Sequence, residues 1–127
     1  MINNFLIIDC IGKDDKLGLG INKEFFIHNL QNKKKDKEKL VSELLNFMSS
    51  HRVEFDENFS VIVNQGPGSF SGIRISLAVA KGIEIAKKVK IYGYNNSDLK
   101  VFNQENITEL FNEKLIEKKL IKPIYLS

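Results

Sequence analysis

A glycine-serine segment between two apolar patterns constrains the fold of this chain most strongly. It reads Gly-Pro-Gly-Ser-Phe-Ser-Gly over residues 66–72, after the apolar run 59–63 and before a helical pattern over 71–88. A short apolar run predicts a buried strand, and apolar residues at helical spacing predict a helix. The region therefore predicts a strand–turn–helix unit, which requires a sheet with a helix packed on it.

The turn itself has the chemistry of an anion-binding loop. Backbone N–H groups at a helix N-terminus favour anions, glycines allow close approach, and serines can cap the helix. The candidate anion-binding residues of the turn are Gly66, Gly68, Ser69, Ser71 and Gly72. The segment is not a Walker A loop, because no Gly-Lys-Ser/Thr follows, nor a dinucleotide fingerprint, because Ser71 stands at its last glycine position. A tight, capped turn without a ligand explains the same residues equally well.

The remaining patterns predict a mixed sheet covered by helices. The expected strands are 5–9, 17–21, 24–28, 59–63 and 89–94, and the expected helices are 36–48, 71–88 and 104–121. Three antiparallel strands followed by crossover units have the order β-β-β-α-β-α-β-α. This is the α/β order of the ribonuclease H-like fold, which also forms each lobe of the actin-like ATPases. We expect residues 1–98 to form this lobe and residues 99–127 to add a C-terminal helix and tail on the same domain.

Composition and charge exclude several classes of protein. The 127 residues carry a formal net charge of +3 and 43% hydrophobic residues, which is typical of a folded domain and a weak signal for nucleic-acid binding. No apolar run reaches the roughly 18 residues of a membrane span, and no signal-peptide pattern opens the chain. We therefore expect a cytoplasmic protein without a membrane partner.

Catalytic and metal-binding patterns are not visible. Cys10 is the one cysteine, and the neighbouring carboxylate of Asp9 disfavours a reactive thiolate. His28 and His51 lack the spacing of a metal-binding pair. Asp9 ends the first predicted strand, where an acid can face Mg²⁺, but the companion acids of a nuclease are missing. We expect a non-enzymatic chain with no required cofactor.

The helix predicted over 71–88 is apolar around most of its circumference, which indicates a binding partner. A surface helix needs one apolar stripe to cover a sheet, and a second stripe needs another covering surface. The helix over 36–48 also has a wide apolar face. The candidate interface residues of the two helices are Leu44, Phe47, Met48, Ile75, Ala78, Val79, Gly82, Ile83 and Ala86. The alternative is that the C-terminal helix of the chain itself fills the second stripe.

At the glycine-serine segment the chain resembles a known family. Gly66-Pro67-Gly68-Ser69-Phe70-Ser71-Gly72-Ile73-Arg74, followed by Ala80-Lys81-Gly82, resembles the signature of the bacterial TsaB family. Ile7-Ile8-Asp9 is similar to the family's first strand, and Pro123-Ile124-Tyr125-Leu126 to its Pro-x-Tyr-Leu ending. The chain departs from the family at Cys10, where Thr or Ser is usual, and in having only one predicted helix and a tail after Tyr94. It resembles a short form that lacks most of a second lobe.

The resemblance implies a function in tRNA modification. It implies a non-catalytic partner that stabilises the transferase TsaD, which makes threonylcarbamoyladenosine next to the anticodon, in a heterodimer joined by the ATPase TsaE. We expect any contact with tRNA to be indirect. A further alternative is a homodimer through the same two helices when TsaD is absent. The alternative function is a stand-alone nucleotide-binding module or weak ATPase, with ATP or ADP and Mg²⁺ held by Asp9 and the loop 66–72.

Overall fold

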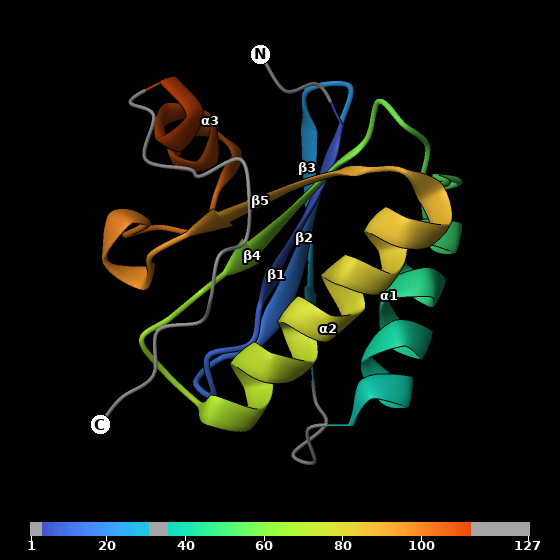
Figure 1. Ribbon diagram of the computed structural model, residues 1–127. Coiled ribbons are helices and arrows are strands. Elements are labelled where there is room, and N and C mark those ends of the chain that lie inside the picture. The colour runs from blue at the N-terminus through green and yellow to red at the C-terminus, as the bar shows by residue number, and fades with distance from the viewer. Residues whose placement is uncertain (1–3, 31–35, 113–127) are drawn as a thin grey trace.

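A five-stranded mixed sheet forms the centre of the molecule. The computed structural model describes residues 4–30 and 36–112, without the side chain of Phe111. The strand order across the sheet is β3-β2-β1-β4-β5, in which β1 pairs antiparallel with β2 and parallel with β4 (Figure 1). The strands are β1 (Phe5–Asp9), β2 (Lys16–Ile21), β3 (Glu24–Asn29), β4 (Ser60–Asn64) and β5 (Lys90–Tyr94).

Helices cover both faces of this sheet. α1 and α2 lie side by side on one face, and α3 lies over the other (Figure 1). The helices are α1 (Lys37–Ser50), α2 (Phe70–Lys87) and α3 (Gln104–Asn112), with a short 3-10 turn, η1 (Asn96–Asp98), after β5. The predicted order of strands and helices is confirmed, with small shifts at element ends. The predicted continuation of the last helix to residue 121 lies outside the described residues.

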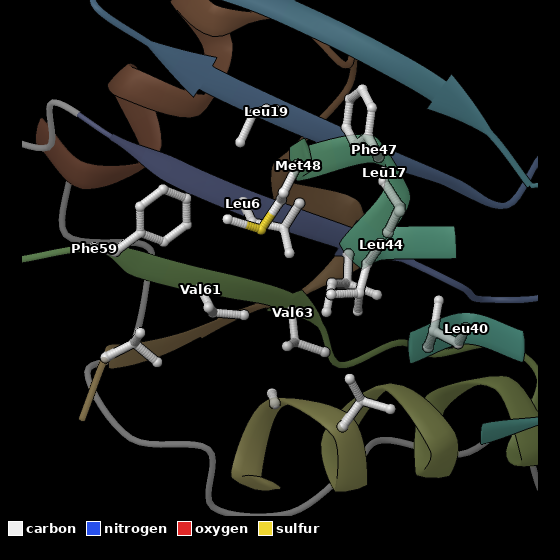
Figure 2. Close-up of a cluster of buried hydrophobic side chains, with 14 of the residues drawn as sticks. Leu6, Leu17, Leu19, Leu40, Leu44, Phe47, Met48, Phe59, Val61 and Val63 are labelled. Carbon is white, nitrogen blue, oxygen red and sulfur yellow. The ribbon is translucent and has the colours of Figure 1, made fainter. Parts of the chain in front are cut away.

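The larger core lies between the sheet and helices α1 and α2. α1 begins after Asp36, whose carboxylate accepts the backbone N–H of Glu38 at 2.8 Å and caps the helix. Its buried side chains, Leu40, Leu44, Phe47 and Met48, recur at helical spacing and point at the sheet (Figure 2). The core cluster includes Leu6, Ile8, Leu17, Leu19, Leu40, Leu44, Phe47, Met48, Val61, Val63, Val79 and Ala80.

Four residues predicted for a partner surface lie in this core instead. Leu44, Phe47, Met48 and Val79 are at most 7% exposed, so the prediction that they form an interface is wrong. The apolar face of α1 is wide because the helix covers several strands at once. At those positions its side chains contact the sheet and are not accessible to a partner. The same packing buries Val79 of α2 against the sheet.

The other five predicted interface residues remain accessible to different degrees. Ile75 and Ile83 are half-buried against the core, while Ala78, Gly82 and Ala86 are exposed. The open face of α2 is therefore rotated from the predicted one. It is outlined by Phe70, Ala78, Gly82 and Ile85, and it is less apolar than the sequence pattern indicated.

A smaller core lies on the opposite face of the sheet. Ile107 and Leu110 of α3 are buried against Phe5 and Ile7 of β1 and Ile62 of β4. α3 thus packs on the same sheet as the two longer helices. Residues 113–127, the remainder of the predicted C-terminal segment, lie outside the described part of the chain.

Candidate functional site

A row of polar side chains crosses the sheet at the carboxyl end of its parallel strands. Asp9 of β1 pairs in register with Lys16 of β2, and Asn64 of β4 with Tyr94 of β5. Ile8 pairs with Val63, so Asp9 and Asn64 are also neighbours. Because residues in register point to the same face of a sheet, these four side chains share the face that α3 partly covers. Phe5, Ile7 and Ile62 form an apolar cluster on the same face, so the polar row at its edge marks a candidate site.

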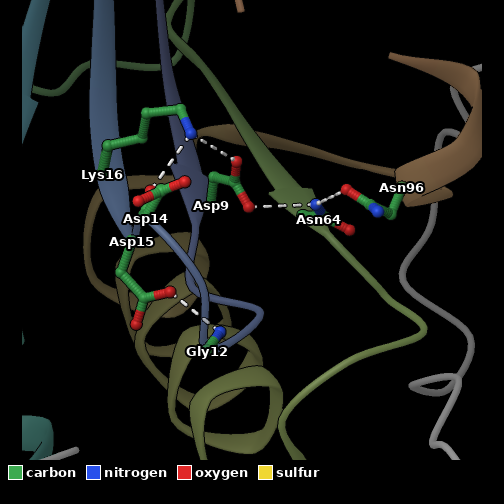
Figure 3. A network of polar contacts seen from close by, with 7 residues as sticks. All are labelled: Asp9, Gly12, Asp14, Asp15, Lys16, Asn64 and Asn96. Atoms are coloured by element: carbon green, nitrogen blue, oxygen red, sulfur yellow. Dashed lines mark hydrogen bonds and ion pairs between the residues drawn. The ribbon is translucent and has the colours of Figure 1, made fainter. Parts of the chain in front are cut away.

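The row is held together by direct contacts (Figure 3). The Lys16 ammonium lies 3.3 Å from Asp9 Oδ2 and donates to the carbonyl oxygen of Asp14 at 3.1 Å. The Asn64 amide donates to Asp9 Oδ1 at 3.0 Å and to Asn96 Oδ1 at 3.1 Å. Both carboxylate oxygens of Asp9 are therefore occupied by donors from neighbouring strands.

Burial controls the protonation of this row. Burial raises the pKa of Asp9 above its ordinary value of 3.8, while the charge of Lys16 and the hydrogen bond from Asn64 oppose that rise. Burial also raises the pKa of Tyr94 well above 10.0, and the negative charge of Asp9 adds to the effect. The Tyr94 hydroxyl therefore stays protonated at neutral pH, in the form that can donate a hydrogen bond.

The glycine-serine loop packs tightly against the end of β1. A Cβ on Gly72 would lie 2.2 Å from the carbonyl oxygen of Cys10, and one on Gly68 would lie 2.6 Å from Ile11 Cβ. The Ser69 N–H donates to the Ile11 carbonyl at 2.7 Å, and the Ser69 hydroxyl accepts the Gly72 N–H at 3.3 Å. Gly68 and Gly72 are therefore required by close packing of the N-terminus of α2 on residues 10–12. This supports the alternative of a capped turn whose glycines serve the fold.

The start of the loop is tied to the polar row. The side-chain oxygen of Asn64 accepts the Gly66 N–H at 2.9 Å, and the Gly66 carbonyl accepts the Asn96 N–H at 2.8 Å. Asn64 thus fixes both the carboxylate of Asp9 and the path of the loop, because its amide donates in one direction and its oxygen accepts in the other. The peptide bond between Gly66 and Pro67 is cis.

The predicted site residues are therefore brought together only in part. Asp9 lines a pocket on the α3 face that contains none of the loop residues 66–72. The sequence pattern did not single out Lys16, Asn64 and Tyr94, which complete the row. Each of the three stands at the first or last position of a strand. The one sequence signal that could have identified them is a polar residue or tyrosine at the end of an apolar strand pattern. These strand ends are aligned by pairing between strands that are distant in sequence, and the local sequence pattern does not predict that pairing.

A second feature is the outer surface of α1 and α2. Leu45 is 49% exposed, Phe70 54% and Ile85 81%. A Cβ on Gly82 would meet no atom within 4 Å, so the fold of this chain does not require glycine there. The Arg74 guanidinium lies 5.1 Å from the centre of the Phe70 ring at the N-terminal end of this surface. The surface combines exposed apolar side chains with a place where another backbone can approach closely.

Within residues 4–30 and 36–112, no group of three or more His, Cys, Asp or Glu residues is arranged to hold a metal ion. Cys10 is buried, 4% exposed, at the end of β1. None of the helices formed by the described residues is both long and apolar enough to cross a membrane.

Known proteins resemble this chain in sequence and in structure. No protein-family model matches the chain. The chain is 32% identical over 79 residues to the tRNA threonylcarbamoyladenosine biosynthesis protein TsaB of Buchnera aphidicola subsp. Acyrthosiphon pisum. The matched segment covers 61% of this chain and 36% of that protein, so the chain spans about a third of the length of this relative.

Two solved structures are similar to the whole described fold. YeaZ from Pseudomonas aeruginosa superposes with a TM-score of 0.67 at 17% sequence identity, over 88% of this chain and 50% of that one. A structure described as an uncharacterized protein with similarity to peptidase YeaZ from Pseudomonas aeruginosa gives the same TM-score of 0.67 and identity of 17%, and is covered to 49%. The predicted α/β fold of the ribonuclease H-like and actin-like group is confirmed.

Proposed function

We propose that this chain, which is similar in sequence to a TsaB protein and in fold to YeaZ, is a non-catalytic scaffold subunit in the biosynthesis of tRNA threonylcarbamoyladenosine. In this function it binds a TsaD-like transferase as a heterodimer and stabilises it. A TsaE-like ATPase joins the larger complex, and tRNA is contacted through the partners. The chain works in the cytoplasm, where tRNA is modified.

The observation that best supports docking is the open space beside Gly82 in the middle of α2. Glycine in the middle of a helix costs about 0.5–1 kcal/mol relative to alanine. No atom of the described chain lies near enough to require its small size. Gly82 lies between the exposed Ala78 and Ala86 on α2, and the exposed Ile85 is close by. These features favour a helix of another protein that approaches α2 closely and covers its apolar side chains.

A substitution that fills the open space tests the docking directly. Gly82→Leu adds a side chain where the fold has room, so the variant is expected to stay folded and to lose binding to the TsaD-like transferase encoded by the same genome. Glu84→Leu is the matched control, because residue 84 lies roughly 200° around the helix axis from residue 82. Titration calorimetry with the wild type and both variants measures the effect. Equal affinity of Gly82→Leu and wild type contradicts docking through α2.

The pathway is tested separately in cells. Depletion of the chain is expected to lower the threonylcarbamoyladenosine content of tRNA, measured by mass spectrometry of digested tRNA. Expression of Gly82→Leu is expected to leave the content low, while Glu84→Leu restores it. Unchanged modification after depletion contradicts the pathway.

A homodimer through the same surface would appear as a concentration-dependent mass in light scattering of the chain alone.

A further inference from the structure

A pocket at the carboxyl ends of β1 and β5 has no part in the proposed docking surface. It is a half-open pocket of about 210 Å³ on the α3 face of the sheet, away from the outer surface of α1 and α2. Its walls come from the β1–β2 connection and from residues 94–102. In open α/β sheets, small ligands bind in the crevice outside the carboxyl ends of the parallel strands. The location by itself therefore suits a small molecule.

The charges around the pocket favour an anion. Three lysines line it, Lys13, Lys16 and Lys100, together with two acids. The carboxylate of Asp9 is already matched by the Lys16 ammonium at 3.3 Å and by the Asn64 amide at 3.0 Å. Lys13 and Lys100 then face the pocket with Asp14 as the remaining acid, which leaves a local excess of positive charge.

The floor of the pocket contains a donor without an acceptor. Tyr94 lines the pocket and is 2% exposed, and its hydroxyl has no hydrogen-bond partner among the described residues. A buried donor that makes no hydrogen bond costs about 1–3 kcal/mol. Such a group in a native protein calls for an explanation, and a ligand oxygen entering from the pocket would supply one.

An apolar wall stands beside these donors. Leu99 and Phe102 line the same pocket, and the Lys16 ammonium lies 4.9 Å from the centre of the Phe102 ring. A ligand that fits this arrangement has oxyanion oxygens at one end and a carbon skeleton at the other. Asp9 lines the pocket but the loop 66–72 does not, so this site shares only Asp9 with the nucleotide site expected from the sequence.

We propose that this pocket binds a small organic oxyanion, a carboxylate or a phosphate ester. The anionic group accepts hydrogen bonds from the ammonium groups of Lys13 and Lys100 and reaches the hydroxyl of Tyr94, and its carbon skeleton contacts Leu99 and Phe102. The Asp9–Lys16 pair stays intact and fixes the wall between β1 and β2.

The test uses the whole 127-residue chain and four probes at constant ionic strength. Succinate represents a carboxylate, inorganic phosphate and glycerol phosphate represent the phosphate class, and ATP with Mg²⁺ represents a nucleotide. Binding is followed by backbone amide shifts of residues 11–14 and 94–100 in two-dimensional NMR. We expect saturable shifts with succinate or with the two phosphate probes, and the class that binds identifies the anionic group. Saturation by ATP with Mg²⁺ alone, or by no probe, overturns the proposal.

Variants separate this pocket from general attraction to lysines. Lys13→Ala with Lys100→Ala is expected to weaken binding by at least about tenfold, because each removes a charge-assisted hydrogen bond. The matched control, Lys23→Ala with Lys90→Ala, removes the same charge from exposed sites outside the pocket and is expected to leave affinity unchanged. Tyr94→Phe is expected to weaken binding by several fold without unfolding the chain, since it removes only an unpartnered hydroxyl. Equal losses in the lysine pair and its control, or full affinity in Tyr94→Phe, contradict the assignment.

Discussion

Two glycines of the same helix have opposite surroundings. Gly72, in the first turn of α2, lies so close to β1 that a Cβ would come within 2.2 Å of the Cys10 carbonyl oxygen. Gly82, in the middle of α2, has open space around it. Alanine at position 72 is expected to cost about 1–3 kcal/mol of stability, the usual penalty for overpacking. Alanine at position 82 is expected to add about 0.5–1 kcal/mol, because alanine is the better helix former.

Urea unfolding of the two alanine variants measures these opposite changes under identical conditions. The comparison is internal, since the same methyl group is added to the same helix. A stable Gly72→Ala variant would mean that β1 and α2 can separate without cost and that the glycine signature is not explained by packing. A destabilised Gly82→Ala variant would mean that the space beside α2 is filled by the chain itself.

Asp9 gives stability a defined dependence on pH. Its pKa in the folded protein lies above the ordinary value, chiefly through burial, so the folded state holds the proton more tightly than the unfolded state. The resulting stabilisation is present below pH about 3.8 and is lost as pH rises through the folded pKa. Asp9→Asn has no such proton. The free energy of unfolding of this variant, relative to wild type, is therefore expected to increase from pH 4 to pH 7, as measured by denaturant titrations.

Lys16→Met provides the complementary variant for this pH dependence. It removes the positive charge that opposes the rise in the pKa of Asp9, so the loss of stability with increasing pH should be larger than in wild type. Parallel curves for wild type and Asp9→Asn across the same range would show that burial does not control this carboxylate.

At the level of elements, α1 shows both what the pattern of a sequence predicts and where it fails. The helical period of its apolar residues predicted the helix and its bounds closely, because amphipathic spacing is a local property. The same period did not separate Leu44, in the core, from Leu45, at the surface. The width of an apolar face reflects how many strands the helix covers, and strand pairing is set by contacts distant in sequence. The interface prediction for α1 failed for that reason.

The polar row could not be predicted from the sequence for the same physical reason. Asp9 was identified because it ends an apolar run, but Asn64 followed a predicted strand and Tyr94 ended one, and neither position carried a functional signal. Only the parallel register of β1, β4 and β5 brings their side chains onto one face. The glycine-serine loop was identified because its signal is local, and its tight packing on residues 10–12 emerged from the structure.

The two adjacent leucines of α1 test its orientation on the sheet. Leu44 is 1% exposed and Leu45 is 49% exposed. Leu44→Ala is expected to lower the free energy of unfolding by about 2–5 kcal/mol through loss of burial and creation of a cavity. Leu45→Ala is expected to change it by no more than about 0.5 kcal/mol. Thermal unfolding followed by circular dichroism measures both, and similar losses in the two variants would contradict the orientation of α1.

On the scale of the whole molecule, one sheet supports two cores of unequal size. α1 and α2 bury a continuous apolar layer on one face, while the described side chains of α3 contribute Ile107 and Leu110 to the other. Regions with few buried contacts open at lower free-energy cost than the global unfolding reaction. α3 is therefore expected to exchange its amide hydrogens faster than β1 and β4, which are buried from both sides.

Ile107→Ala makes this hierarchy measurable. Ile107 is fully buried at 0% exposure, and truncation removes part of the contact between α3 and β1. The cost of about 2–5 kcal/mol should appear as faster exchange across α3, because that helix can detach while the α1–α2 layer holds the sheet together. Amide exchange in native conditions is the measurement, with β4 as the internal reference. If β4 accelerates as much as α3, the chain unfolds as one cooperative unit, and the α3 face contributes to the stability of the entire sheet.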